Sequence, residues 1–232
     1  MKTITIIACV VLTSFVLFSC GQSVQRPKQS VIARKYSDGD KPADLSKYSQ
    51  ATFAAGCFWH EETLFESIKG VAEVVSGYAG GDTEHPTYES IETGTTGHAE
   101  TVNIYYDSSK ISYPQLLDIY FAAMEDPTQV NGQGPDHGTQ YRSIVFYRNA
   151  AEKNMAQDYI KKLNATGKYN NPIAATVDPL TKFWEAEDYH QDYINTHTEN
   201  PYVSGVSIPD IQHYQQRHPE MIKPGRNFAT GK

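Results

Sequence analysis

The chain has 232 residues, of which 39% are hydrophobic, 12% aromatic and 20% charged. This composition is typical of a globular protein and excludes a mainly disordered, collagen-like or multi-spanning membrane chain. Twenty lysines and arginines against 27 aspartates and glutamates leave a formal charge of -7, and no basic run indicates a nucleic-acid-binding surface. The three cysteines are too few for a disulfide framework, so each needs its own explanation.

The N-terminus has the features of an export signal. Met1 and Lys2 form a short basic start, and residues 4–18 carry no charge. This stretch is short for a membrane span, which needs roughly 20 apolar residues, and it fits the apolar region of a secretory signal. It ends in Ser19-Cys20-Gly21, which resembles a bacterial lipobox. A plain signal peptide and a single anchor helix are the alternatives.

We therefore expect a lipoprotein signal peptide over residues 1–19, lipidation of Cys20 and a polar tether over residues 20–47. The mature protein would be exported and anchored in a membrane, facing the periplasm or the cell surface. Cys9 would leave with the signal and Cys20 would become a thioether. Cys57 would then be the only free thiol.

From residue 48 onward, segments with strand-like and helix-like patterns alternate. This order predicts a compact α/β (α+β) sandwich, ferredoxin-like, in which a mixed sheet has flanking helices. The helix at 113–124 is apolar almost all round, so we expect it to be buried. Strands are expected at 51–55, 71–78, 98–106, 142–147 and 173–177, and helices at 57–68, 113–124 and 150–163.

Two segments of this domain lack a regular pattern. Residues 125–141 form a long loop rich in Gly, Gln and Asp, and such loops are more often functional or mobile than merely connecting. Prolines and a glycine interrupt the C-terminal residues at positions 209, 219, 224 and 225. We therefore predict a domain over residues 48–205, followed by an irregular tail over 206–232 that wraps it.

Cys57 lies at the predicted turn from the first strand to the first helix. A cysteine in the first turn of a helix is close to unpaired N–H groups, which stabilise the thiolate and lower the thiol pKa. Glu61 and Glu62 oppose this effect, and His60 would restore it as an imidazolium beside the sulfur. Such a thiolate would suit nucleophilic chemistry. The alternative is a buried free cysteine that packs as a small hydrophobe.

Phe58 and Trp59, which follow Cys57, also allow two interpretations. They could be ordinary core residues of the first helical turn. Alternatively, two aromatic faces beside a thiolate form an apolar pocket that suits a methyl group on sulfur.

Five motifs occur in order over residues 56–143, and together they closely resemble the A-type peptide-methionine sulfoxide reductase family. This family reduces the S-epimer of methionine sulfoxide, and the resemblance extends over residues 48–202. The motifs are Gly56-Cys57-Phe58-Trp59, Gly77-Tyr78-Ala79-Gly80-Gly81, Pro86-Thr87-Tyr88, Gly97-His98-Ala99-Glu100 and Asp136-His137-Gly138-Thr139-Gln140-Tyr141-Arg142-Ser143.

The resemblance implies a role for each matched residue near the thiol. Cys57 matches the nucleophile that attacks the sulfoxide sulfur. Phe58 and Trp59 match the walls that hold the S-methyl group.

A second matched group concerns the sulfoxide oxygen. Glu100 matches the acid that protonates this oxygen, Tyr88 and Tyr141 match the hydroxyls that complete the oxygen site, and Asp136 matches a residue lining the substrate pocket. The departing oxygen needs a proton donor, and a glutamate acting as an acid near neutral pH needs a raised pKa. The alternatives are a solvated strand glutamate at position 100 and a loop-capping role for Asp136 and His137.

The chain departs from the family pattern at two points. His60 stands where family members commonly have glycine. The segments 89–94 and 203–205, where family members often have a resolving cysteine, contain none. We therefore expect an external thiol, such as a thioredoxin-like or glutaredoxin-like protein, to reduce the Cys57 sulfenic acid. We expect no cofactor or metal, since neither His-Glu-x-x-His nor Cys-x-x-Cys occurs.

The expected partners are oxidised proteins or peptides, with the protein itself a monomer. Two rival functions stay open at this stage. One is a thiol hydrolase that pairs Cys57 with a histidine such as His98 or His190. The other is a non-catalytic surface module whose aromatic residues bind a partner.

Overall fold

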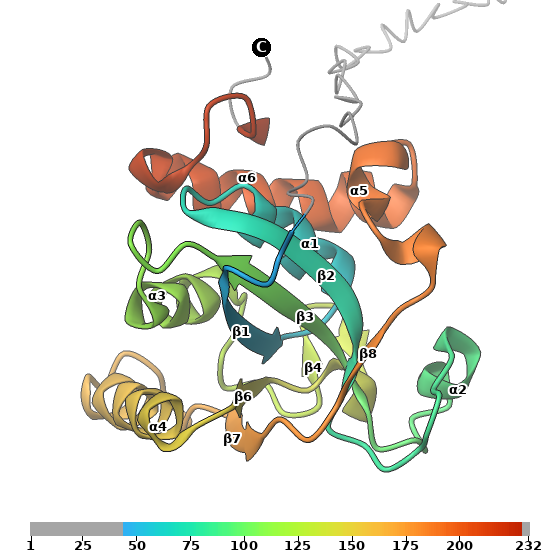
Figure 1. The fold of residues 1–232 in the computed structure, drawn as a ribbon, viewed down its shortest axis with the longest axis horizontal. Coiled ribbons are helices and arrows are strands. Elements are labelled where there is room, and N and C mark those ends of the chain that lie inside the picture. The colour runs from blue at the N-terminus through green and yellow to red at the C-terminus, as the bar shows by residue number, and fades with distance from the viewer. Residues whose placement is uncertain (1–43, 229–232) are drawn as a thin grey trace, which may run out of the picture. The chain divides into compact units, whose positions relative to one another are not determined.

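The computed structural model describes residues 44–228. The predicted signal peptide, Cys20 and the tether up to residue 43 lie outside the described residues. A six-stranded sheet in the order β7-β6-β1-β3-β2-β8 is the centre of the described part (Figure 1). Its strands are β1 (Ser49–Ala54), β2 (Val71–Ala79), β3 (Ala99–Tyr106), β6 (Ile144–Tyr147), β7 (Thr176–Pro179) and β8 (Phe183–Glu185).

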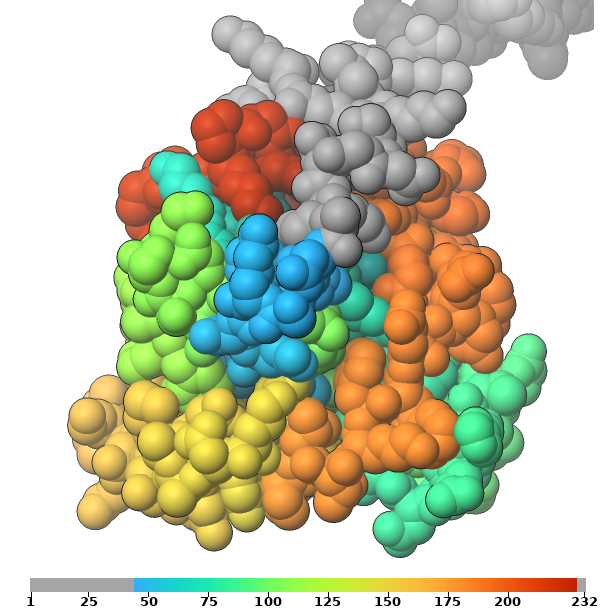
Figure 2. All heavy atoms as spheres, viewed as in Figure 1, coloured from blue at the N-terminus to red at the C-terminus, as the bar shows by residue number. Residues whose placement is uncertain are grey.

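The sheet is mixed, because β7 runs parallel to β6 and all other neighbouring strands are antiparallel. In the middle of the sheet, Phe53 of β1 lies opposite Val102 of β3, and both side chains are fully buried. Drawn with all atoms, β1 lies between the α3 region and the segment around β8 (Figure 2). The predicted α/β sandwich is confirmed, whereas the finer ferredoxin-like description stays a prediction.

Three longer helices match the predicted positions: α1 (Phe58–Glu66), α3 (Tyr113–Ala123) and α4 (Ala150–Ala165). Helix α3 begins with a capping box in which Ser112 and Gln115 satisfy each other's backbone N–H groups. It is buried as expected, with Leu116 and Tyr120 fully inaccessible. Helix α4 is capped by the Asn149 side chain and turns its apolar residues toward the core.

The prediction of an irregular C-terminal tail is wrong for its first part. Residues Ile208–Arg217 form helix α6, which follows a π-helical segment at Val203–Ser207 and contacts α1 and α3. Pro209 does not interrupt this helix. It lies in the first turn of α6, directly after the π-helical segment, where the backbone hydrogen-bond pattern already changes, so a missing N–H is tolerated. Its buried residues Ile211 and Tyr214 lie three positions apart on one face.

The last described residues close onto α1. The Lys223 N–H donates to the Ser67 carbonyl (2.8 Å), and Ile222 forms a β-bridge with Ile68. A short helix, α5 (Tyr193–Thr196), lies beside α1. Within residues 44–228, no helix is both long enough and apolar enough to cross a membrane.

Short elements position the loops near Cys57. Helix α2 (Tyr88–Glu92) begins with a capping box at Thr87 and Ser90. The long loop contains a two-residue hairpin of β4 (Gly132–Gln133) and β5 (Asp136–His137), followed by a 3-10 turn at Thr139–Tyr141. The 125–141 loop is therefore ordered by local pairing around Asp136.

Candidate active site

The turn before α1 fixes the position of Cys57. Gly56 has φ +82°, and a Cβ there would approach the Gln133 Cβ to 2.8 Å, so glycine is required for both reasons. Cys57 itself is the N-cap of α1, and the His60 N–H donates to the Cys57 carbonyl (3.2 Å). The residue keeps part of its surface exposed, so a small group can reach the thiol.

The thiol pKa does not move in the predicted direction. Burial raises the pKa of Cys57 well above its usual range, and the carboxyl groups of Glu100 and Asp136 raise it further. The backbone N–H groups of Trp59 and His60 lower the pKa, but they do not outweigh burial. The expected imidazolium is also wrong, because burial lowers the pKa of His60 to about 4 and leaves the ring neutral. The free enzyme therefore holds Cys57 as a thiol at neutral pH.

Glu100 is a buried acid aimed at the start of α1. Its side chain is 2% exposed, and its Oε2 accepts a hydrogen bond from the Phe58 N–H (3.0 Å). Burial raises the pKa of Glu100 well above its ordinary value, and the nearby Glu92 and Asp136 add to this effect. Glu100 is therefore not a solvated strand glutamate, and its raised pKa favours the protonated form that can donate a proton.

Two phenols share the surroundings of Glu100. The Tyr141 hydroxyl donates to Glu92 Oε1 (3.0 Å), and the Tyr88 N–H donates to Glu187 Oε1 (3.0 Å). Burial is the main cause that raises the pKa of both tyrosines, and the Glu100 carboxyl is the second. Both hydroxyls therefore stay protonated. Tyr88 can donate to an oxygen beside Glu100, and Tyr141 can do so when its hydroxyl turns away from Glu92.

Phe58 and Trp59 differ in exposure. The Phe58 side chain is 1% exposed and lies 5.0 Å from the His190 ring, centroid to centroid, so it is a core residue as well as a neighbour of the thiol. Trp59 is half-buried, stacks on Tyr193 with 3.7 Å between ring centroids and donates from Nε1 to His190 Nδ1 (3.0 Å). The indole is thus held in place from two sides, which gives the site a rigid aromatic wall.

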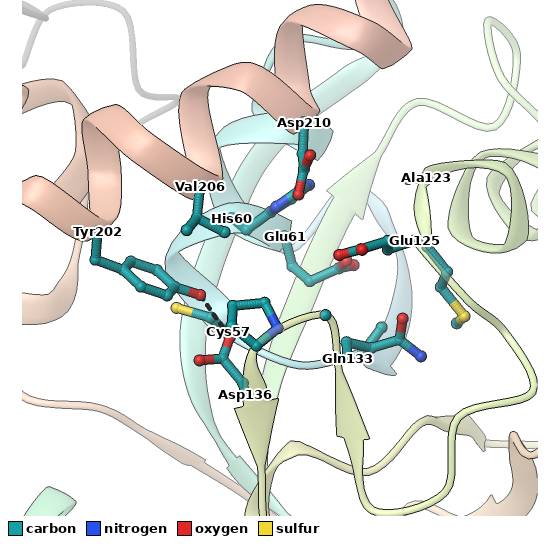
Figure 3. A pocket seen from close by; sticks show the side chains of 14 residues that line it. Cys57, His60, Glu61, Ala123, Glu125, Gln133, Asp136, Tyr202, Val206 and Asp210 are labelled. Carbon is teal, nitrogen blue, oxygen red and sulfur yellow. Dashed lines mark hydrogen bonds between the residues drawn. The ribbon is translucent and has the colours of Figure 1, made fainter.

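Tyr202, which sequence reasoning missed as a site residue, lies beside both Asp136 and Cys57. The Tyr202 hydroxyl donates to Asp136 Oδ2 (2.5 Å), and the Tyr202 ring lies beside the Cys57 side chain (Figure 3). After burial, Cys57 is the next cause that raises the pKa of Tyr202. Tyr202 was noted only as the end of the family resemblance, and His190 only as the base of a rival hydrolase. No local sequence pattern around Pro201 predicts that Tyr202 lies beside Cys57, which is far away in the sequence.

The only group of described residues that resembles a metal site is already occupied by internal contacts. Carboxylate oxygens of Glu62, Glu66 and Asp192 all lie within 4.8 Å of one another. Glu62 accepts hydrogen bonds from the Ser76 hydroxyl (3.0 Å) and the Asp192 N–H (3.1 Å), and Arg226 pairs with Glu66 (3.2 Å). These contacts make the cluster a structural network that holds α1 to the segments around Ser76, Asp192 and Arg226.

These groups define a class of protein. A thiol at a helix N-terminus, a neutral buried acid, two phenols and an aromatic wall suit the removal of oxygen from a small apolar sulfur compound. A thiol hydrolase would need an imidazole bonded to the thiol, and no histidine in the described part of the chain makes that bond. The site is therefore that of a thiol-dependent oxidoreductase.

Comparisons with known proteins identify the family within this class. The family model described as peptide methionine sulfoxide reductase matches residues 49–221. A peptide methionine sulfoxide reductase of Mesorhizobium japonicum is 44% identical over 171 residues, covering 74% of this chain and 88% of that protein. One from Picrophilus torridus is 47% identical over 164 residues, covering 71% and 92%.

A solved structure agrees with these relatives. Mxr1 of Saccharomyces cerevisiae in its reduced form matches with a TM-score of 0.61 and 30% identity, covering 72% of this chain and 91% of that one. The chain belongs to the peptide methionine sulfoxide reductase family, as an oxidoreductase that reduces methionine sulfoxide with a thiol.

Proposed function

We propose that this chain reduces the S-epimer of methionine sulfoxide, in oxidised proteins and as the free amino acid. The observation that carries the proposal is the buried Glu100 carboxyl, fixed by the Phe58 N–H beside Cys57. Burial keeps this acid protonated, and a sulfoxide oxygen leaves readily only after it has taken up a proton.

The chemistry starts from the neutral Cys57 thiol. Cys57 loses its proton and attacks the sulfoxide sulfur while Glu100 protonates the oxygen. The hydroxyl then transfers from the substrate sulfur to the Cys57 sulfur, so both the sulfur–oxygen bond of the substrate and the newly formed sulfur–sulfur bond break. The proton released by Cys57 restores the Glu100 carboxylic acid. Methionine and a Cys57 sulfenic acid result, so the substrate gains the two electrons that the thiol loses.

The surrounding side chains divide the remaining work. Tyr88 and Tyr141 donate hydrogen bonds to the oxygen as negative charge develops on it. Phe58 and Trp59 hold the S-methyl group, which restricts the orientation of the sulfoxide and so selects one epimer. Asp136, held by Tyr202, lines the substrate pocket next to the thiol.

The reductant must come from outside this part of the chain. Residues 44–232 contain one cysteine, Cys57, so they cannot form an internal disulfide. A thiol of a thioredoxin-like or glutaredoxin-like protein attacks the Cys57 sulfenic acid and releases water. A second thiol of that protein then breaks the mixed disulfide and restores Cys57.

We also propose that the protein works outside the cytoplasm, anchored through a lipid on Cys20. The basic start, the uncharged residues 4–18 and the cysteine that follows Ser19 support this proposal. Mass spectrometry of the protein from membranes should find a diacylglyceryl group on Cys20. A Cys20→Ala variant should be soluble and keep its reductase activity. An unmodified Cys20 in the mature wild-type protein would contradict the proposal.

Catalytic turnover with separated epimers tests the reductase activity. Peptides that contain the S- or the R-sulfoxide are incubated with the protein and excess dithiothreitol, and methionine is quantified by chromatography. We expect multiple turnovers of the S-epimer alone and no product with Cys57→Ser. Equal reduction of both epimers, or activity that survives Cys57→Ser, would refute the proposed mechanism.

A further inference from the structure

A pocket next to Cys57 has a different character from the sulfoxide site. Cys57, Asp136 and Tyr202 line it, whereas Glu100, Tyr88 and Tyr141 do not (Figure 3). Its volume is about 30 Å³, which is enough for a group the size of a water molecule or an ammonium ion. The proposed mechanism uses Cys57 and Asp136 at the border of this pocket and leaves its other acids, Glu61, Glu125 and Asp210, without a role.

The pocket lining is rich in carboxyl groups and holds no lysine or arginine. Among its lining residues are the acids Glu61, Glu125, Asp136 and Asp210. His60 also lines the pocket, but its ring is neutral because burial lowers its pKa to about 4. Four carboxyl groups therefore surround one small volume, and the basic side chains that act on them are His213 at Asp210 and His137 at Asp136.

Glu61 gives a second, independent indication that a ligand binds here. Its side chain is 3% exposed, and its Oε2 has no hydrogen-bond partner in the described residues. A buried polar oxygen without a partner is costly, and such atoms in native proteins usually have a reason. A hydrogen-bond donor that enters the pocket would satisfy this oxygen.

The other two carboxyl groups reach the pocket from separate elements. Glu125 follows α3, and its Oε2 lies so close to Gly134 that a Cβ at that position would collide with it. Asp210 comes from the first turn of α6, where burial and then Glu125 raise its pKa. The two carboxyl groups thus repel each other, and a cation between them would remove this repulsion.

Resting on the proposed function, we propose that this pocket binds the ammonium group of a lysine next to the oxidised methionine in a protein substrate. Cys57, Asp136 and Tyr202 border this pocket as well as the sulfoxide site, so the neighbouring residue of a bound substrate passes its opening. Met124 and Val206 in the lining offer apolar surface for the lysine methylenes. Three donor hydrogens of the ammonium match the surrounding carboxyl oxygens.

Matched peptides test this substrate preference. Each contains one S-sulfoxide, with lysine, norleucine or glutamate directly before it or directly after it. The kcat/KM values are measured with excess dithiothreitol. We expect the lysine peptide of at least one series to exceed the norleucine peptide by about tenfold, with the glutamate peptide slowest.

Variants connect the preference to the pocket. In the double variant Glu61→Gln/Asp210→Asn, the ratio of lysine to norleucine peptide should fall to about one. Asp158→Asn is the control, since it removes an exposed carboxylate on α4, outside the pocket, and should keep the wild-type ratio. Circular dichroism checks the fold, and Asp210→Asn alone gives the test if the double variant does not fold.

The outcomes separate the pocket from the chemistry. Equal kcat/KM for the lysine and norleucine peptides in both series, or a lysine preference that survives the variants, would overturn the pocket assignment. Reduction of the norleucine peptide would still support the proposed function, which fails only if no peptide is reduced. Thermal stabilisation by Ca²⁺ or Zn²⁺ alone, without a lysine preference, would assign the pocket to a metal and also overturn the proposal.

Discussion

Glu100 and Glu61 are both buried glutamates near Cys57, and burial raises the pKa of both. They differ in their partners. Glu100 accepts a hydrogen bond from the Phe58 N–H, whereas one oxygen of Glu61 has no partner in the described structure. Burial therefore raises the pKa of both carboxyl groups, but only the hydrogen bond from Phe58 fixes the position of Glu100 near Cys57.

Replacing Cys57, which lies near both glutamates, should have the largest effect on activity. A Cys57→Ser variant should abolish sulfoxide reduction. A thiol accepts the sulfoxide oxygen and becomes a sulfenic acid, whereas a serine hydroxyl cannot accept it. Chromatographic assay of methionine from the S-epimer measures the loss, and circular dichroism confirms that the variant folds. Residual turnover above the uncatalysed rate would show that another group reacts.

Glu100→Gln should slow reduction by about 10²- to 10⁴-fold, the usual contribution of a positioned general acid. The amide can still accept the Phe58 N–H, so the change removes mainly the transferable proton. In the wild type, kcat/KM should fall as pH rises through the raised pKa of Glu100, and this decline should be absent in the variant. An unchanged pH profile would argue against Glu100 as the proton donor.

The titration of Glu61 should make the free energy of unfolding depend on pH. Burial raises its pKa from 4.5 to about 8, so between these values the folded state holds a proton that the unfolded state has lost. Unfolding free energy should then fall as pH rises, by up to about 1.4 kcal/mol per pH unit. Glu61→Gln removes this dependence, so its stability advantage over wild type should grow from pH 5 to pH 8.

Urea unfolding at several pH values measures this advantage. Asp158→Asn, at an exposed position on α4, is the matched control and should differ from wild type by a small amount that does not change with pH. A difference between Glu61→Gln and wild type that is constant from pH 5 to pH 8 would mean that Glu61 titrates normally.

The smallest effect is expected at Tyr202. Tyr202→Phe keeps the ring but removes the hydroxyl that donates to Asp136 and lies near the Cys57 thiol. The loss of one hydrogen bond to a charged group corresponds to a drop of about tenfold in kcat/KM. The hydroxyl lowers the pKa of Asp136, so that pKa should rise in the variant, as followed by NMR titration. A wild-type rate and an unshifted Asp136 would remove Tyr202 from the site.

Sequence reasoning located the parts of the molecule that depend on local pattern. The residue pattern at 98–106 predicted the strand that carries Glu100, and Gly56 marked the turn that presents Cys57. The pattern alone favoured a solvated Glu100, and only the family resemblance pointed to the buried acid that the structure has. Helix α6 was missed because Pro209 was treated as a helix breaker, although a proline in a first turn is well tolerated. The strand β8 was missed because three residues are too few to show a period.

The electrostatics of the site could not be predicted, since they arise from contacts between distant segments. The helix N-terminus at Cys57 suggested a lowered pKa, but burial raises the pKa, and Glu100 of β3 and Asp136 of β5 raise it further. His60 loses its charge through burial, which no local pattern indicates. The neighbours of the thiol are set by tertiary packing.

The most direct test of the account is a single-turnover reaction without any reductant. The chain from residue 44 onward, with Cys57 as its one thiol, is mixed with an excess of S- or R-sulfoxide peptide, and methionine is counted per protein. The account predicts about one equivalent from the S-epimer, none from the R-epimer, and a sulfenic acid on Cys57 that dimedone traps. No methionine from the S-epimer, or product without a modified Cys57, would contradict it.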